Sequence, residues 1–274
     1  MDPVSRQSYT AAVERLDSMT TGDRPVPLAG VGDEILAFAA LLGREPRLRR
    51  ALSDPSRDGS DRAGLVVSLL GDKVGEDTRT LLSTLVGGHW SAPSELLTAT
   101  ERLGIEVLLA SADSAGELAE VEDELFRFGQ VVDASQDLAA ALGTSTTPPS
   151  ERARLVTDLL RGKAKPLTVR LVEVALVGFG GRNFAGSLSR LVELCADRRD
   201  REVAYVTVAT TLSESEADRL SARLAQLYGR DVALKVSVDP DIIGGMSVRV
   251  QYDLYDGTVA RRLELARADL TGKH

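Results

Sequence analysis

Residues 232–263, VALKVSVDPDIIGGMSVRVQYDLYDGTVARRL, decide the fold of the C-terminal part of the chain. Apolar and polar residues alternate over 232–238 and again over 246–250, which predicts two strands that each bury one face. Between them, Pro240 fixes the backbone φ angle, and the pair Gly244-Gly245 allows angles that other residues avoid. The chain is therefore expected to turn or bulge before the second strand begins.

A turn and a helix are expected after the second strand. Asp256-Gly257 is a turn dipeptide, and Thr258 is placed to cap the helix that follows. Apolar residues then recur at helical spacing at Val259, Leu263, Ala266 and Leu270. The turns of this unit are accordingly assigned to five residues: Pro240, Gly244, Gly245, Asp256 and Gly257.

The preceding stretch predicts one more strand and one more helix. Residues 203–209 are rich in β-branched and aromatic side chains, which predicts a strand buried on both faces. Ser213 and Glu216 form a capping box, an apolar stripe follows at helical spacing, and Gly229 can end that helix. The order strand, helix, strand, strand, helix describes a compact α/β domain of about 70 residues, which is near the lower size limit for an independent core.

These motifs carry a family resemblance. Asp-Pro at 239–240, Ile-Gly-Gly at 243–245, Val-Arg-Val at 248–250 and Asp-Gly-Thr-Val at 256–259 occur in the order found in the delta subunit of F-type ATP synthases. That family includes the bacterial relatives of the oligomycin-sensitivity-conferring protein. The resemblance covers the C-terminal quarter and departs from the family pattern at 251–252, where Gln-Tyr replaces the usual Gly-Asp.

The rest of the chain contains an internal repeat. Residues 61–70, DRAGLVVSLL, read almost as residues 151–160, ERARLVTDLL, at an offset of 90. The repeated apolar sets have helical spacing, as at Ile35, Phe38, Ala39 and Leu42, at Leu65, Leu69 and Leu70, and at Leu81, Leu82 and Leu85. We therefore predict a mainly α protein with two tandem helical bundles, 1–90 and 91–200, followed by a small α/β domain at 201–274.

The resemblance implies a function and partners. Members of the family are stator subunits in the peripheral stalk of F-type ATP synthase, and they link the catalytic head to the b-subunit stalk without catalysing ATP synthesis. The bundle would bind the N-terminal helix of an alpha subunit, and the α/β domain would bind the b subunit. The protein would then lie peripherally on the cytoplasmic face of the cell membrane. Residues 1–90 would be an added copy of the bundle, as in a long form of the subunit.

For the second bundle, we expect the alpha-subunit helix to dock in a groove between the first and the fifth helix. The residues assigned to this groove are Leu103, Val107, Leu108, Leu167, Leu171 and Val174. Most of the apolar residues in each bundle are nevertheless expected to form its own core. A general helical scaffold that binds other partner helices is the alternative function.

Composition argues against most catalytic and membrane-spanning functions. The chain has 274 residues, a formal net charge of −8, two histidines and one cysteine, so no metal site, cofactor or catalytic triad is expected. Excess negative charge argues against nucleic acid as a partner. No apolar run is long enough to insert into a bilayer. Cys195 lies on an apolar helical face and is expected to be buried.

One glycine-rich run offers a competing interpretation. Residues 176–186, LVGFGGRNFAG, resemble a dinucleotide-binding turn, but Asn183 replaces the third glycine of the usual spacing. At the 90-residue offset, the apolar stretch before these glycines corresponds to a segment with helical spacing. The run is therefore expected to be a helix that its glycines terminate.

Overall fold

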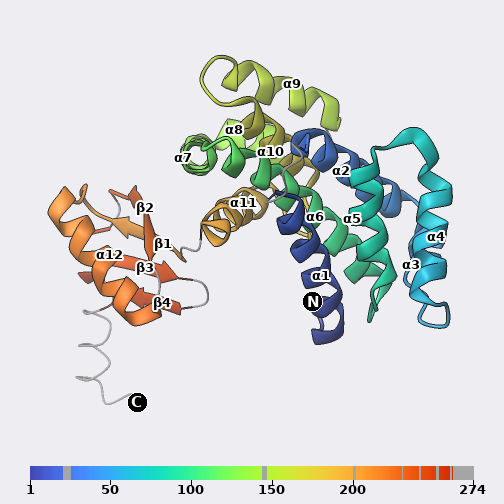
Figure 1. Ribbon diagram of the computed structural model, residues 1–274. Helices are drawn as coiled ribbons and strands as arrows, with labels where there is room; N and C mark the ends of the chain where they lie inside the picture. The colour runs from blue at the N-terminus through green and yellow to red at the C-terminus, as the bar shows by residue number, and fades with distance from the viewer. Residues whose placement is uncertain are drawn as a thin grey trace, which may run out of the picture. The chain divides into compact units, whose positions relative to one another are not determined.

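The computed structural model describes residues 1–20, 26–143, 147–199, 202–229, 231–240, 242–250, 253–259 and 261 (Figure 1). The helical part contains α1 (Pro3–Thr20), α2 (Leu28–Arg44), α3 (Pro46–Leu52), α4 (Gly59–Leu70), the short 3-10 helix η1 (Gly71–Lys73), α5 (Glu76–Gly87), α6 (Pro93–Ser114), α7 (Leu118–Asp133), α8 (Gln136–Gly143), α9 (Pro149–Leu160), α10 (Pro166–Val177) and α11 (Phe184–Arg198). The sheet part contains β1 (Glu202–Val208), α12 (Glu214–Tyr228), β2 (Val232–Val238), β3 (Met246–Val250) and β4 (Asp253–Asp256). The predicted mainly α fold with a small α/β domain is confirmed.

Helix positions repeat along the chain at the spacing that the sequence indicates. Helices α2, α4 and α5 begin at Leu28, Gly59 and Glu76, and α7, α9 and α10 begin 90 residues later at Leu118, Pro149 and Pro166. Prolines at the first helical position suit α6, α9 and α10, because the amide that proline lacks has no partner inside the helix there. Both repeated segments contain only helices and their connections within the described residues.

Helix α6 belongs to both copies of the repeat. It begins 90 residues after α1, yet it also packs against α1, α2, α3 and α5 as the last helix of the first bundle. Twelve of its residues are buried, whereas only five residues of α1 are. A helix that is covered on several sides needs apolar residues all round, and this explains why the apolar pattern of α6 is so dense.

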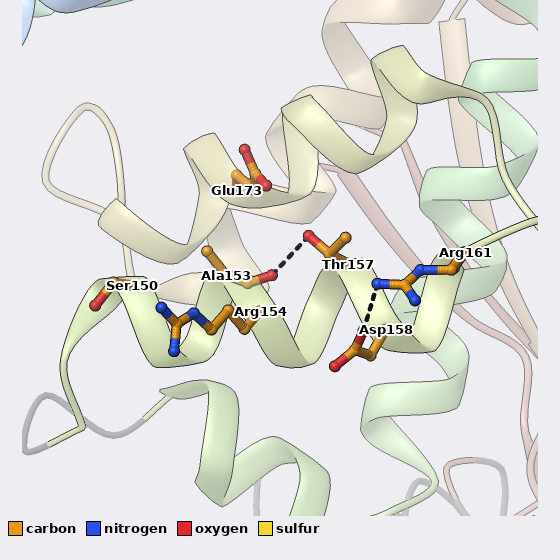
Figure 2. A pocket seen from close by; sticks show the side chains of 7 residues that line it. All are labelled: Ser150, Ala153, Arg154, Thr157, Asp158, Arg161 and Glu173. Atoms are coloured by element: carbon orange, nitrogen blue, oxygen red, sulfur yellow. Dashed lines mark hydrogen bonds and ion pairs between the residues drawn. The ribbon is translucent and has the colours of Figure 1, made fainter.

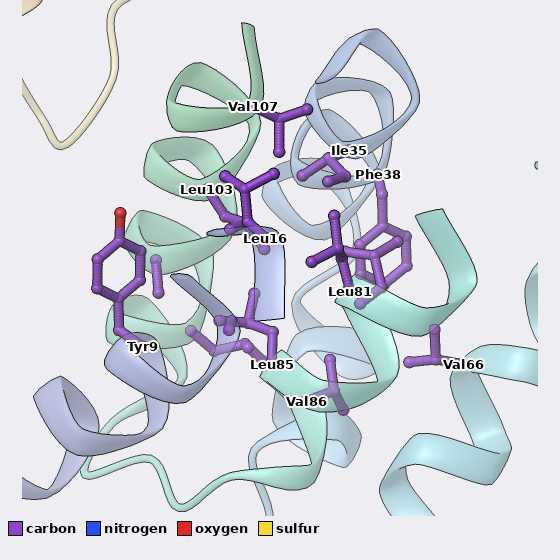
Figure 3. Packing of buried hydrophobic residues seen from close by; sticks show 14 of the residues in the cluster. Tyr9, Leu16, Ile35, Phe38, Val66, Leu81, Leu85, Val86, Leu103 and Val107 are labelled. Carbon is purple, nitrogen blue, oxygen red and sulfur yellow. The ribbon is translucent and has the colours of Figure 1, made fainter. Parts of the chain in front are cut away.

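The core of the first bundle is formed by side chains from α1, α2, α4, α5 and α6 (Figure 3). Leu16, Ile35, Leu81, Leu85 and Leu103 are removed from solvent in it. Two of the predicted apolar faces, on α2 and α5, are buried as expected. The predicted face of α4 is wrong in part, because Val66 and Leu70 face the core and Leu69 is exposed.

The C-terminal sheet has the order β2-β1-β3-β4. Strand β1 runs parallel to β2 and antiparallel to β3, with Val206 opposite both Val236 and Val248. Helix α12 packs against β2, and its Leu224 joins Ala204 and the valines of the sheet in one core. Its capping box at Ser213 and Glu216 and its left-handed cap at Gly229, with φ 74°, are both as predicted.

Three details of the sheet differ from the sequence expectation or lie outside it. Strand β4 was not predicted, because all four of its residues are exposed and show no burial alternation. On β1, Ala204, Val206 and Val208 are buried, but Tyr205 and Thr207 are only half-buried, so burial on both faces is wrong. The expected last helix begins as predicted, with the Arg261 amide 3.3 Å from Thr258 Oγ1. The rest of that helix lies outside the described residues.

By its internal contacts the chain divides into two compact units. One contains residues 1–121 and 140–187, and the other contains residues 122–139 and 188–274. This division follows contacts, whereas the predicted limits at 90 and 200 follow the repeat. The three-domain division therefore stays a prediction. None of the helices in the described part of the chain is both long and apolar enough to cross a bilayer.

Candidate functional site

The three groove residues predicted on α6 lie against the first bundle. Leu103 and Val107 belong to its core, where Figure 3 shows them with Ile35 and Phe38. Leu108 is 1% exposed. These three side chains are therefore occupied by contacts within the chain, and their role in binding an alpha-subunit helix stays a prediction.

Close contact between α2 and α6 explains the burial of Leu108. A Cβ atom added at Gly32 of α2 would lie 2.7 Å from the Leu108 side chain, and one added at Gly104 of α6 would lie 2.8 Å from Leu36. Because both residues lack a side chain, α2 and α6 approach each other closely. A leucine of the opposite helix fills the space that each Cβ atom would occupy. The sequence pattern gave no sign of this crossing.

The other three predicted groove residues lie on α10. Leu171 is buried, while Leu167 and Val174 are half-buried. Helix α10 contacts α6 and α9, and its Arg170 pairs with Asp33 of α2 at 2.6 Å. Helix α10 is thus in contact with α2 of the first bundle, through Arg170 and Asp33, as well as with the helices of its own bundle. Binding of a partner at these residues also stays a prediction.

The predicted turn residues meet at one end of the sheet. The Gly257 amide donates to Met246 O at 3.0 Å and the Val259 amide to Gly244 O at 2.9 Å, which ties the loop before β3 to the turn after β4. Gly245 adopts φ 84° and Gly244 does not adopt positive φ. Asp256 accepts hydrogen bonds from the hydroxyl and amide of Thr258, and these hold the pKa of its carboxyl below 3.8.

Pro240 also takes part in this loop. It follows Asp239, whose amide donates to Val208 O at 2.9 Å. Proline has no amide to donate and so ends β2 pairing at this point. The five residues singled out from the sequence therefore shape the loop before β3 and the turn after β4, which lie at the same end of the sheet.

The glycine-rich run after α10 terminates a helix, as predicted. Helix α10 extends to Val177, and Gly178, Gly180 and Gly181 all adopt positive φ. The Gly180 amide donates to Glu101 Oε2 at 2.9 Å, so a carboxylate already occupies the place where a phosphate would have to lie. Within the described residues, no cluster of side chains could hold a metal ion.

A partly buried ion cluster joins the sheet to α7 and α11. Lys235 Nζ of β2 lies 2.9 Å from Glu122 Oε1 and 2.6 Å from Asp123 Oδ1, both on α7. Arg199, directly after α11, reaches Glu122 Oε2 at 2.8 Å. Lys235 stands on the face of β2 that its alternating pattern predicts to be solvated, yet it is 6% exposed. Sequence reasoning missed this joint, because a buried lysine looks like any other lysine in a strand.

Further contacts of α7 and α11 reinforce the joint. Gln130 Nε2 of α7 donates to Val236 O of β2 at 3.3 Å, and the Tyr205 hydroxyl of β1 donates to Ser189 O of α11 at 3.2 Å. Burial raises the pKa of Tyr205 well above its ordinary value, so this hydroxyl stays protonated. We call the contacts around Lys235, Glu122 and Arg199 the sheet joint.

A second surface feature lies between α9 and α10 (Figure 2). It is an open cavity of about 520 Å³ lined by Ser150, Ala153, Arg154, Thr157, Asp158, Arg161 and Glu173. Five of these residues come from α9, Arg161 directly follows α9, and Glu173 comes from α10. We call it the α9–α10 groove.

Taken together, the repeated helices, the shared α6 and the sheet joint define a class of protein: tandem helical bundles with a small C-terminal α/β domain. A family model described as ATP synthase delta (OSCP) subunit matches residues 106–270. The chain therefore belongs to the ATP synthase delta (OSCP) subunit family.

Relatives share nearly the whole length of the chain. A protein named ATP synthase subunit delta from Salinispora arenicola is 60% identical over 263 residues, which is 96% of each chain. One from Streptomyces griseus is 42% identical over 272 residues, covering 99% of this chain and 100% of its own. One from Thermobifida fusca is 38% identical over the same span. The added N-terminal copy lies before the segment that the family model matches, and these actinobacterial relatives have it too.

Proposed function

We infer that this chain is the stator subunit of an F-type ATP synthase, a structural part of the peripheral stalk. The observation that carries this function is the family match together with relatives of the same name over nearly the full length. A general helical scaffold, the alternative, has no observation that favours it.

We propose that the helical part binds the N-terminal helix of an alpha subunit and that the α/β part binds the b subunit. The α/β part exposes three large apolar side chains: Leu227 of α12 is 62% exposed, Ile243 before β3 80% and Leu254 of β4 64%. We take these exposed apolar side chains as the candidate contacts of the b subunit. The sheet joint would then pass force from this surface to α7 and α11.

We also propose that the chain has no catalytic activity and lies peripherally on the cytoplasmic face of the membrane. A stator resists torque and needs binding surfaces, not reacting groups. The lack of catalytic activity is tested by calorimetric titration of the purified chain with ATP and Mg²⁺, and heat from tight binding would contradict it. The peripheral location is tested by salt extraction: a peripheral chain should be released from the membranes by salt.

Coupling in membranes tests the function itself. Membranes depleted of the chain should hydrolyse ATP without pumping protons, and the purified chain should restore pumping. A double variant, Ile243→Asp with Leu254→Asp, should fail to restore it because the b subunit no longer docks. Val67→Asp, at an exposed valine of α4, is the matched control and should restore pumping. Full proton pumping in depleted membranes would show that the stator function is wrong.

A further inference from the structure

The connector between the two copies, residues 88–92, leads from the end of α5 to the start of α6. Glycines at 87 and 88 are typical of a flexible link, because glycine allows many backbone angles. The structure instead pairs their backbone groups. Arg62 of α4 donates to Gly87 O at 3.1 Å and to Gly88 O at 2.7 Å, and the Gly88 amide donates to Leu85 O at 3.3 Å. The start of the connector is therefore held by the first bundle.

Two buried serines of α1 hold the rest of the connector. Ser8 Oγ accepts a hydrogen bond from the His89 amide at 2.8 Å and donates one to His89 O at 2.9 Å. Ser5 Oγ accepts a hydrogen bond from the Ser91 amide at 3.0 Å. Ser5 and Ser8 are three residues apart and so lie on one face of α1. We call these two residues the serine clamp.

The indole ring of Trp90 fixes the middle of the connector. Trp90 belongs to the core of the first bundle, and its Nε1 donates to Leu85 O at 3.1 Å. Gly88 lies so close to α1 that an added Cβ atom would overlap the Cβ atom of Ser8. Because its polar groups are paired and its aromatic ring is buried, the connector lacks the freedom of a hinge.

Helix α1 also contacts α6 directly, on both sides of the serine clamp. The Asp2 amide donates to Glu95 Oε1, in the first turn of α6, at 2.8 Å. The Arg102 guanidinium of α6 lies 4.9 Å from the centroid of the Tyr9 ring, which is a cation–π contact. Both helices also contribute to the core that Figure 3 shows. These contacts fix the direction in which α6 leaves the connector.

The equivalent link after the second copy is built differently. At the 90-residue offset, Ser5 corresponds to Glu95 and Ser8 to Thr98, and Thr98 is exposed. The link itself, 178–181, contains three glycines with positive φ. By internal contacts, the chain divides between compact units soon after this link, whereas residues 1–121 form one uninterrupted stretch of a single unit. The helix repeat alone therefore does not require the serine clamp, which is a property of the junction between the copies.

We propose that the first copy is a rigid brace for α6, and that the serine clamp locks the connector so that it cannot act as a hinge. Helix α6 has 22 residues and is therefore about 33 Å long. It reaches α10 of the second copy, where Arg170 also pairs with Asp33 of α2. Load on the first bundle would pass along α6 and would not be lost in bending of the connector. The use of this stiffness in a stator rests on the proposed function, whereas the locked connector is a property of the chain itself.

Amide hydrogen exchange of the purified full-length chain gives the first measurement. The amides of His89 and Ser91 should exchange about a hundredfold or more slowly than in an unfolded peptide, because each has a buried serine oxygen as acceptor. Exchange of both amides at the unfolded rate would overturn the locked connector.

Removing the serine clamp gives the second measurement. Ser5→Ala with Ser8→Ala should speed exchange of the His89 and Ser91 amides about tenfold, because both lose their acceptors. Trp90 is the only tryptophan of the chain, and acrylamide should quench its fluorescence about twofold more strongly in this variant. Thr10→Ala is the matched control, since the Thr10 hydroxyl donates to Arg6 O within α1. It should leave exchange and quenching unchanged.

A second pair of variants disturbs the connector from its own side. Gly88→Ala should push the connector away from Ser8 and raise the quenching of Trp90. Gly87→Ala is the matched control, because its Cβ atom would meet its nearest neighbour, Gly59 O, only at 3.6 Å. A variant that matches its control in exchange and quenching, in either pair, would overturn the serine clamp.

Reconstitution separates the brace from the stator function. The double serine variant should bind to depleted membranes as the unmodified chain does, but it should restore proton pumping less fully. Full pumping by this variant, with its connector shown to be loosened, would overturn the brace and leave the stator function intact. Failure of the unmodified chain to restore pumping would overturn the stator function and leave the locked connector, which is measured on the chain alone.

Discussion

Lys235 of β2 and Glu122 of α7 form an ion pair at 2.9 Å whose side chains are only 7% and 1% exposed. In the first copy, the position equivalent to Glu122 is Gly32, the residue that lets α2 approach α6. The two copies therefore use one helix position differently. In the first copy, Gly32 at this position lets α2 pack closely against α6. In the second copy, Glu122 at this position forms an ion pair with Lys235 of the sheet.

Replacing Lys235 by Met should destabilise the second compact unit. Glu122 would keep Arg199 as a partner but lose one of its two cations, and breaking a buried pair by removing one partner costs roughly 3–5 kcal/mol. Urea unfolding followed by fluorescence would measure the loss. Arg57→Ala removes an exposed pair with Asp54 and should cost less than about 1 kcal/mol. Equal losses for the two variants would mean that the sheet joint contributes little.

Arg62 should be more sensitive to substitution than its repeat partner Arg152. The buried Arg62 guanidinium donates to five backbone carbonyls, those of Asp54, Arg57, Val86, Gly87 and Gly88. Among the residues that the structure describes, Arg152 donates to the carbonyls of Leu142 and Leu176, and its Nε has no partner there. Arg62→Met leaves more buried carbonyls unsatisfied, so it should cost about 2–4 kcal/mol and Arg152→Met less.

Thermal unfolding of both methionine variants checks this order. Arg62→Lys is a useful second variant, since it keeps the charge but cannot reproduce the planar fork of donors. It should recover only part of the lost stability. A larger loss for Arg152→Met than for Arg62→Met would contradict the prediction.

Gly245 should tolerate a side chain much less well than Gly244. At φ 84° a Cβ atom on Gly245 would lie 2.4 Å from Gly257 O, whereas one on Gly244 would meet Val259 at 3.3 Å. Gly245→Ala should therefore cost about 1–3 kcal/mol, and Gly244→Ala clearly less. Calorimetry on the full-length chain would measure both. An unchanged melting temperature for Gly245→Ala would show that the turn relaxes freely.

Glu101 should make stability depend on pH in the acidic range. Burial raises its pKa above the ordinary 4.5, despite the hydrogen bond from the Gly180 amide. The folded state then binds the proton more tightly than the unfolded chain, so the contribution of this group is complete below pH 4.5 and is lost as pH rises through the raised pKa. Glu101→Gln keeps the acceptor for Gly180 and removes the charge.

The Gln variant should consequently gain in melting temperature relative to the unmodified chain as pH rises from 4 to 7. At neutral pH, the free energy of unfolding of the Gln variant should exceed that of the unmodified chain by up to about 1 kcal/mol. Melting curves at four pH values would measure it. A difference between the two proteins that is constant with pH would contradict the assignment to Glu101.

Local patterns in the sequence predicted much of the fold correctly. The strands at 232–238 and 246–250, the capping box at Ser213, the buried Cys195 and the helix stop at Gly178 all depend on residues close in sequence. Such features follow from backbone angles and side-chain periodicity, which neighbouring residues set. Strand β4 was not predicted, because its residues are all exposed and so show no alternation of buried and exposed positions.

The sequence by itself determined the family, the fold class and the 90-residue spacing of the helices, because motif order and apolar periodicity can be read from the order of residues along the chain. Only the tertiary structure decided that α6 is covered as the last helix of the first bundle, that Leu103, Val107 and Leu108 are occupied within the chain, and that Lys235 is buried against Glu122. The physical reason is that burial depends on which residues distant in sequence come together. A leucine in a groove and a leucine in a core have the same helical spacing, and only the neighbouring helix distinguishes them.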